Sequence, residues 1–137
     1  IPASGMIGTA RAFARHYAAM RADGLDGARL LHPDTIRHAC VTYRGDDGSH
    51  VGWTDRLGLG YTLGAGTHTA CDATIIAPWP DAFGHTGYSG SLGMYCPSQD
   101  LAVAMTKNAL FPGLRECFRW DHVLQAVCDG LAIPYHS

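Results

Sequence analysis

Helical periodicity is strongest near the start of the chain, over residues 9–22. Apolar side chains recur there every three or four positions, which places them along one side of a helix: Ala10, Phe13, Ala14, Tyr17 and Met20. Thr9 is suited to cap the N-terminus, and Gly24 is suited to the left-handed position after the C-terminus. A second, shorter helix is predicted over residues 32–39, although His32 stands where a serine or threonine cap is expected.

The middle of the chain and its last third carry strand patterns. Residues 57–63 alternate leucine or tyrosine with glycine or threonine, which predicts a strand. Residues 73–77 favour a further short strand. The apolar segments 91–96 and 101–106, separated by the turn sequence PSQD at 97–100, predict a β-hairpin.

The chain ends in another helical pattern. Its apolar positions step by three and four residues: Cys117, Trp120, Leu124, Val127 and Leu131. Short turns between neighbouring strands favour antiparallel pairing, so the order of elements predicts an α+β fold in which helices flank an antiparallel sheet. At this length we expect residues 1–137 to form a single domain.

Composition narrows the functional classes. A hydrophobic content of 47% and a charged content of 16% indicate a globular protein, and no apolar run is long enough to cross a bilayer. The net charge of −2 gives no electrostatic basis for binding nucleic acid. The 5 cysteines are odd in number and form no C-x-x-C, so we interpret them as free thiols. The first residue is Ile1, which favours a fragment or a processed chain.

Candidate chemistry is concentrated in 83-FGHTGYSGSLG-93. A G-x-S-x-G nucleophile elbow does not fit, because Ser91 stands at the fifth position and a strand follows instead of a helix. A local His85–Ser89 dyad needs a sharp fold-back, since an extended segment separates the two residues by about 13 Å. We therefore interpret Ser89 and Ser91 as turn and strand residues.

A metal site is not predicted. The tightest group of possible ligands, His68 and Cys71, offers two, whereas zinc takes three or four.

Several segments resemble, in order, the C-terminal part of the β-lactamase-like serine hydrolases. These are GTARAFARHYAAMRADG at 8–24, LLHPDTI at 30–36, GLGYTLG at 58–64, the motif at 83–93 and TKNAL at 106–110. The family includes class C β-lactamases, D-aminopeptidases and related carboxylesterases. The resemblance implies a partial β-lactamase/transpeptidase-like fold, contributed by the C-terminal portion of a larger hydrolase domain.

The resemblance also implies roles for the motif residues. His85, Thr86 and Gly87 match the family's Lys-Thr-Gly or His-x-Gly triplet. His85 would orient the substrate or stabilise negative charge, and Gly87 would let the strand pass close to the substrate. The N–H of Tyr88 would be one of two oxyanion-hole donors.

The implied reaction is acyl transfer through a serine ester, on a small ester or amide and with no metal or organic cofactor. Histidine in place of lysine favours an esterase or peptidase-like activity over β-lactam resistance, because a lysine suits a β-lactam carboxylate better. Trp79, in the loop before the motif, and Ser89 are candidates for the substrate pocket.

The chain departs from the family pattern in two respects. Lys107 is its only lysine and follows Ala104 by three residues, so no Ser-x-x-Lys occurs. Asn108 is its only asparagine, and no Tyr-x-Asn occurs. We therefore expect the nucleophile in an N-terminal portion that these residues do not include. The alternatives are a non-catalytic remnant or binding module that reuses the fold, and His85 as an ordinary strand histidine.

Overall fold

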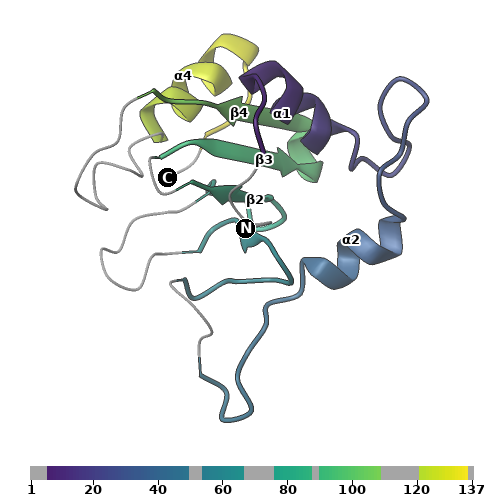
Figure 1. Ribbon diagram of the computed structural model, residues 1–137. Coiled ribbons are helices and arrows are strands. Elements are labelled where there is room, and N and C mark those ends of the chain that lie inside the picture. The colour runs from purple at the N-terminus through teal and green to yellow at the C-terminus, as the bar shows by residue number, and fades with distance from the viewer. Residues whose placement is uncertain (1–5, 50–53, 67–75, 88–89, 109–120, 136–137) are drawn as a thin grey trace.

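The computed structural model describes residues 6–49, 54–66, 76–87, 90–108 and 121–135 (Figure 1). Its antiparallel sheet has the strand order β1-β2-β3-β4. The strands are β1 (Thr62–Leu63), β2 (Phe83–Thr86), β3 (Leu92–Cys96) and β4 (Leu101–Met105). The helices are α1 (Ala10–Ala18), α2 (Pro33–Ala39) and α4 (Asp121–Leu131), and a short 3₁₀ turn, η2 (Pro97–Gln99), joins β3 to β4. The predicted α+β class is confirmed.

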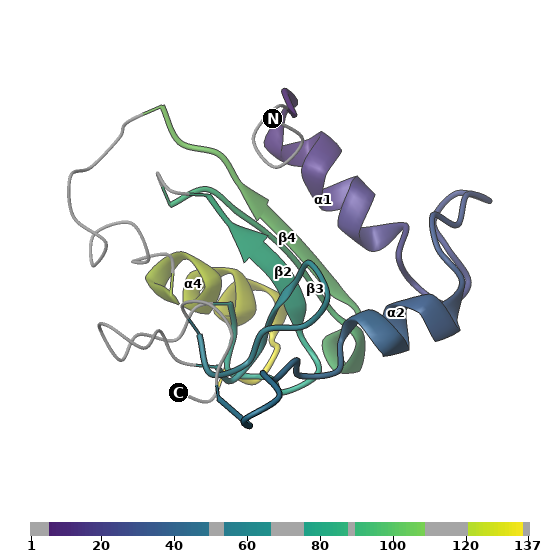
Figure 2. The ribbon, with the colours of Figure 1, turned by 60° about the horizontal axis from the view of Figure 1, so that its bottom comes forward.

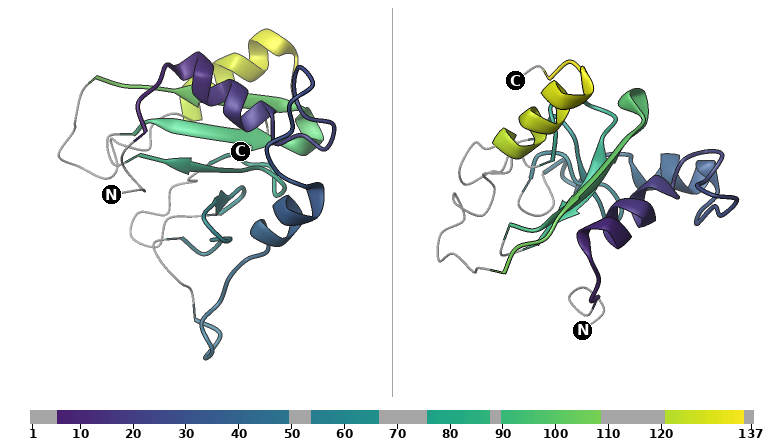
Figure 3. Two further views of the ribbon diagram at one scale, coloured as in Figure 1. Left: turned by 45° about the vertical axis from the view of Figure 1, so that its right-hand side comes forward. Right: turned by 90° about the horizontal axis from the view of Figure 1, so that it is seen from above.

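The sheet separates two apolar clusters, one on each face. Successive strand residues point to opposite faces, so Leu92 and Met94 face α4 whereas Tyr95 faces α1. Figure 3 shows α1 and α4 on opposite sides of the sheet. The α4-side cluster comprises Ile76, Ala77, Trp79, Ala82, Leu92, Met94, Cys96, Leu101, Leu124 and Cys128. The α1-side cluster comprises Tyr17, Met20, Leu63, Phe83 and Tyr95.

The first helix begins as predicted and ends early. Thr9 caps α1, because its Oγ1 accepts a hydrogen bond of 3.2 Å from the main-chain N–H three residues on. The helix ends at Ala18 instead of residue 22, since the next turn is closed by tighter bonds such as Met20 N–H to the carbonyl of Tyr17. Gly24 has the expected positive φ, +76°.

The second helix, α2, also lies where it was predicted. His32 acts as its cap, because Nδ1 accepts a hydrogen bond of 3.2 Å from the N–H of Asp34. The imidazole thus supplies the acceptor that a serine or threonine would have provided.

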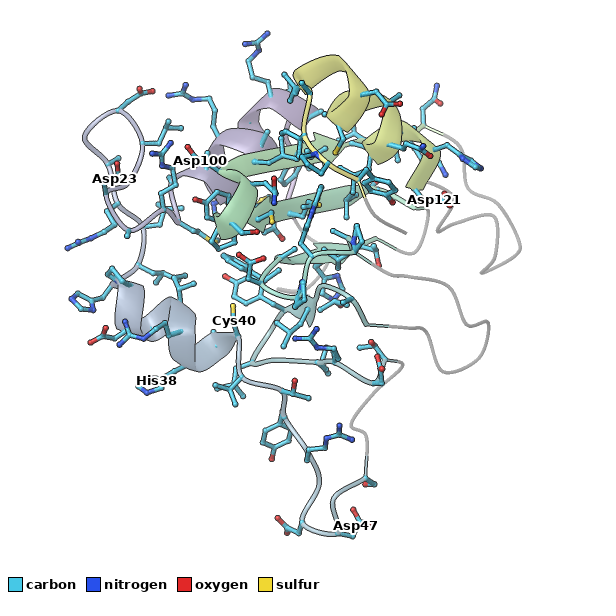
Figure 4. The ribbon with its side chains drawn as sticks, turned by 180° about the vertical axis from the view of Figure 1, so that it is seen from behind. Asp23, His38, Cys40, Asp47, Asp100 and Asp121 are labelled. Atoms are coloured by element: carbon cyan, nitrogen blue, oxygen red, sulfur yellow. The ribbon has the colours of Figure 1, made fainter. Side chains whose placement is uncertain are left out.

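Ion pairs and hydrogen bonds anchor the predicted β3–β4 hairpin. Arg21, in the turn after α1, pairs with Asp23 at 3.1 Å and with Asp100 in the hairpin turn at 3.0 Å. Figure 4 shows these two aspartates on neighbouring segments. Asp81 accepts hydrogen bonds from the N–H and the hydroxyl of Ser98, at 2.7 and 2.9 Å. The turn is therefore fixed both to α1 and to the segment before β2.

The strand predicted over residues 57–63 is wrong in its extent. The chain reverses at Gly60, where φ is +86°, and Leu57 forms an isolated antiparallel bridge with Thr62. Only Thr62 and Leu63 join the sheet. The alternation of large and small residues there belongs to a tight turn, which a period of two cannot distinguish from a strand over so few residues.

The C-terminal helix agrees in part with the predicted stripe. Leu124 and Cys128, one turn apart, are buried against the sheet, whereas Leu131 is exposed near the helix end. The first two members of the stripe, and most of the predicted strand at 73–77, lie outside the described residues. No helix within the described ranges is long and apolar enough to span a membrane.

Alkaline pH is expected to destabilise the fold through Tyr17 and Tyr95. Burial raises the pKa of each hydroxyl from 10.0 to about 12, and the Asp100 carboxylate adds to the shift at Tyr95. The unfolded chain loses these protons first, so the free energy of unfolding falls as pH rises from about 10 to about 12 and is unaffected by them below about pH 9.

Urea denaturation across this range checks the expectation, and tyrosinate absorbance at 295 nm follows the ionisation itself. Tyr17→Phe removes one of the tyrosines whose pKa is raised to about 12 and should flatten the pH dependence. Ionisation of every tyrosine in one step near pH 10 would contradict the prediction.

Candidate active site

The motif strand β2 presents His85 at the surface. Phe83 and Gly84 are buried, His85 is exposed and Thr86 is buried again. In the register with β3, His85 lies opposite Gly93, so the two residues share the face that α1 covers. Figure 1 shows β3 between β2 and β4, and Figure 2 shows α1 and α4 on opposite sides of the sheet.

Half of the outer side of β2 is not paired with β1. The two strands pair at Thr62 with Gly84 and at Leu63 with Phe83, and the pairing does not continue to His85 and beyond. Between these described strands, pairing with β1 therefore covers only the first half of the motif strand.

The direction of the main chain follows from the hairpin bonds. Gly87 N–H donates to the carbonyl of Ser91 at 2.7 Å, so the main-chain groups of Gly87 point toward β3. Main-chain groups alternate in direction along a strand, and those of Thr86 therefore point to the outer side. Gly90 closes the turn with φ +82° and a bond of 2.8 Å from its N–H to the carbonyl of Gly87.

A hydrogen bond sets the tautomer of His85. Its Nδ1 lies 2.7 Å from the carbonyl oxygen of Thr86. A carbonyl oxygen only accepts, so Nδ1 carries the proton, and in the neutral ring Nε2 carries the lone pair. The ring thus lies at the outer side of β2, to which the Thr86 carbonyl points.

Glycines of the motif differ in the space around them. A Cβ on Gly84 would lie 2.2 Å from the carbonyl oxygen of Gly93, and a Cβ on Gly93 would lie 2.3 Å from Cε2 of Tyr17. At Gly87 the nearest atom to such a Cβ is the Cβ of Ser91 at 3.5 Å, an ordinary contact, and φ is not left-handed. Among the described residues, neither packing nor backbone conformation therefore requires the glycine at 87.

The other residues predicted for the site either lie far from His85 or fall outside the residues that the structure describes. Trp79 is buried in the α4-side cluster, 5.9 Å from Tyr135 between ring centroids, on the face opposite His85. Its role as a pocket wall stays a prediction. Tyr88 and Ser89 lie outside the described residues, so the roles expected for them also stay predictions.

Three free cysteines are described: Cys40, Cys96 and Cys128. Burial raises the pKa of each thiol, for Cys40 to about 11, so these thiols are protonated near neutral pH and are weak nucleophiles. Figure 4 shows the sulfur of Cys40 directed toward the sheet, whereas His38 on the same helix points away.

The described residues around His85 form neither a group of metal ligands nor a wall of the two cavities below. Within the described ranges no group of three or more histidine, cysteine or acidic side chains is placed to hold a metal. Two cavities, of about 410 and about 560 Å³, lie at the opposite end of β2, where Phe83 and Pro97 line both.

A model of the Beta-lactamase family matches residues 2–127. The chain belongs to the Beta-lactamase family. Comparison with curated proteins and with solved structures found no match. The match confirms the resemblance in the sequence and identifies a serine-hydrolase-like family.

Sequence reasoning missed one contact beside the motif of this Beta-lactamase-family chain. Tyr17 was assigned to a general apolar stripe, yet its ring covers Gly93 beside His85. The available signal was Gly93 itself, since a glycine within a strand often marks close approach of another segment.

Gly87 and Gly93 give a matched pair of substitutions. Gly93→Ala forces a methyl group into the Tyr17 ring, so we expect the free energy of unfolding to fall by roughly 1–3 kcal/mol. Gly87→Ala makes only ordinary contacts with Ser91 and should change the free energy of unfolding by less than about 0.5 kcal/mol. Urea denaturation of both variants beside the parent chain measures the difference. Equal destabilisation would contradict the geometry described here.

The tautomer of His85 can be read directly by ¹⁵N NMR of the imidazole. Nδ1 should show the shift of a protonated ring nitrogen and Nε2 that of an unprotonated one, at a pH where the ring is neutral. Assignment by comparison with His85→Gln identifies the signals. The reverse pattern, with the proton on Nε2, would exclude the hydrogen bond to the Thr86 carbonyl.

Proposed function

We propose that this chain carries one wall of the active site of a serine hydrolase that cleaves a small ester or amide through an acyl-serine intermediate. The observation that carries the proposal is the triplet His85-Thr86-Gly87 at the end of β2, in a chain that belongs to the Beta-lactamase family. Its histidine is exposed, and β1 pairs with the first half of its strand. We place the substrate acyl group along the second half.

Gly87 contributes through the absence of a side chain. No described contact requires a glycine there, so a substrate or the attacking serine can approach the main chain where a Cβ would stand. The Gly87 N–H is engaged by Ser91, which leaves the proposed oxyanion donor to Tyr88. Thr86 supplies the carbonyl that holds the His85 ring.

His85 contributes an acceptor instead of a fixed positive charge. With the proton on Nδ1, the neutral ring offers Nε2 to a donor such as a leaving alcohol or amine. A lysine at this position would carry a permanent charge suited to a carboxylate. The substrate we propose is therefore an ester or amide without a carboxylate at the point that faces His85.

The nucleophile is proposed to come from an N-terminal portion of the same protein, so that residues 1–137 form the C-terminal portion of the hydrolase domain. The chain contains neither Ser-x-x-Lys nor Tyr-x-Asn. It also exposes large apolar side chains that such a portion would cover. Ile7 is 99% exposed, Val41 62% and Leu59 60%.

A serine-directed fluorophosphonate tests the proposal by intact mass. We expect no adduct on the 137-residue chain and one stoichiometric adduct on the protein extended by its preceding coding sequence. Gly87→Ala in the extended protein should slow labelling at least about tenfold with unchanged stability, because the methyl group blocks the approach to the strand.

Two results would contradict the proposal. An adduct on the 137-residue chain that Ser89→Ala or Ser91→Ala abolishes would mean that the motif holds its own nucleophile. An extended protein that forms no adduct and cleaves no ester would favour the non-catalytic alternative.

A further inference from the structure

A cavity of about 410 Å³ lies at the end of the sheet where β2 begins, and the candidate active site does not use it. Three parts of the chain that are distant in sequence meet around it: the turn after α1, the helix α2 and the β3–β4 hairpin. Its volume falls within the range of about 300–1,000 Å³ that is typical of small-molecule sites.

The inner wall of this cavity is apolar. Met20 and Phe83 are 5% and 1% exposed, and they contribute a thioether and an aromatic face. Ile36 of α2 and Pro97 of the hairpin complete the apolar part of the lining. A flat or branched hydrocarbon group of a ligand would therefore be removed from water against these side chains, which is the main source of affinity in such pockets.

Charged side chains form the mouth of the cavity and are joined to one another. The Arg21 guanidinium pairs with a carboxylate on each side, through Nε to Asp23 at 3.1 Å and through a terminal nitrogen to Asp100 at 3.0 Å. The hydroxyl of Tyr95 donates to the other carboxylate oxygen of Asp100 at 3.2 Å. Burial raises the pKa of Tyr95 to about 12, so near neutral pH this phenol is a neutral donor.

The charge of the mouth favours a cation. Two carboxylates and one guanidinium leave one negative charge in excess among the lining residues. An anion would have to displace Asp23 or Asp100 from Arg21, whereas an ammonium can bind both carboxylates while these pairs stay intact, because a carboxylate accepts several hydrogen bonds. Arg29, whose guanidinium donates to the Ala22 carbonyl at 3.5 Å, lies outside the lining.

We propose that this cavity binds a small organic amine, with its hydrocarbon body against Met20 and Phe83 and its ammonium group on the carboxylates of Asp23 and Asp100. The site is separate from His85, which does not line the cavity, so the proposal does not rest on the proposed hydrolase function. A bound amine would link the turn after α1, the helix α2 and the hairpin.

Three probes of similar size separate the effect of charge from that of the apolar body. These are 2-phenylethylamine, 2-phenylethanol and 3-phenylpropionate, each titrated into the 137-residue chain and followed by ¹H–¹⁵N NMR. The amine should give saturable shifts at the amides of Ala22 and Ile36, with a dissociation constant roughly 3- to 10-fold below that of the alcohol, since the carboxylates are partly exposed to solvent. The propionate should bind most weakly.

Asp100→Asn removes one of the two charges with little change of shape. Asn tolerates the left-handed backbone of this position, where φ is +45°, and its side-chain oxygen can still accept from Tyr95. The amine should then bind no more tightly than the alcohol. Asp23→Asn, which leaves the hairpin turn untouched, should weaken amine binding in the same direction.

Asp47→Asn is the matched control. This aspartate lies in another turn, where it accepts a hydrogen bond from the Ser49 N–H that an asparagine can also accept. Figure 4 shows it at the far end of the molecule from Asp23 and Asp100. The variant has the same change of net charge and should bind the amine as the parent chain does.

Salt gives a further check, because about 1 M NaCl shortens the screening length to about 3 Å and should remove the advantage of the amine over the alcohol. Three results would overturn the proposal: no saturable shift at the cavity residues, equal affinity for the amine and the alcohol in the parent chain, or equal weakening in Asp100→Asn and Asp47→Asn.

Discussion

The close contact of α1 with the sheet at Gly93 is the constraint on which the arrangement of the motif strand depends. On the α1 side, Gly93 and its partner Ala104 have little or no side chain, and Ala102 is similarly small. On the α4 side, β3 and β4 present larger residues such as Met94 and Val103. The helix can therefore lie closer to the sheet on the side that carries His85, and a single aromatic ring fills the space between them.

This asymmetry has a consequence for the chemistry. A residue on α1 can lie on β3 directly beside His85, which a helix spaced by large side chains could not do. The Tyr17 ring lies on Gly93, the register partner of His85, and the Thr86 carbonyl accepts a hydrogen bond from the His85 ring. Fixing the imidazole by a hydrogen bond reduces its conformational freedom, which is what preorganisation of a site requires.

Much of the fold was predictable because local signals and tertiary packing agree. The Thr9 cap and the β3–β4 hairpin both rest on short-range chemistry that the full fold leaves intact. The prediction from sequence was wrong where one local pattern is compatible with two different backbone conformations. The alternation over residues 57–63 fits a strand, yet a left-handed Gly60 turns it into a reversal, and only pairing with β2 decides how much of it joins the sheet. The triplet His85-Thr86-Gly87 was recognisable, but its support by α1 depends on a contact between distant segments.

Three of the four glycines of the motif, Gly84, Gly87 and Gly93, show why residue type alone could not locate the site. Gly84 and Gly93 are required by neighbouring atoms that leave no room for a Cβ. Gly87 has room for one and an ordinary backbone conformation, so neither packing nor strain explains it. Among the described residues no contact requires the glycine at 87, which supports the proposed approach of a substrate to the main chain there. The sequence presents the three as equivalent, and only the atoms around each one separate Gly84 and Gly93, which the packing requires, from Gly87.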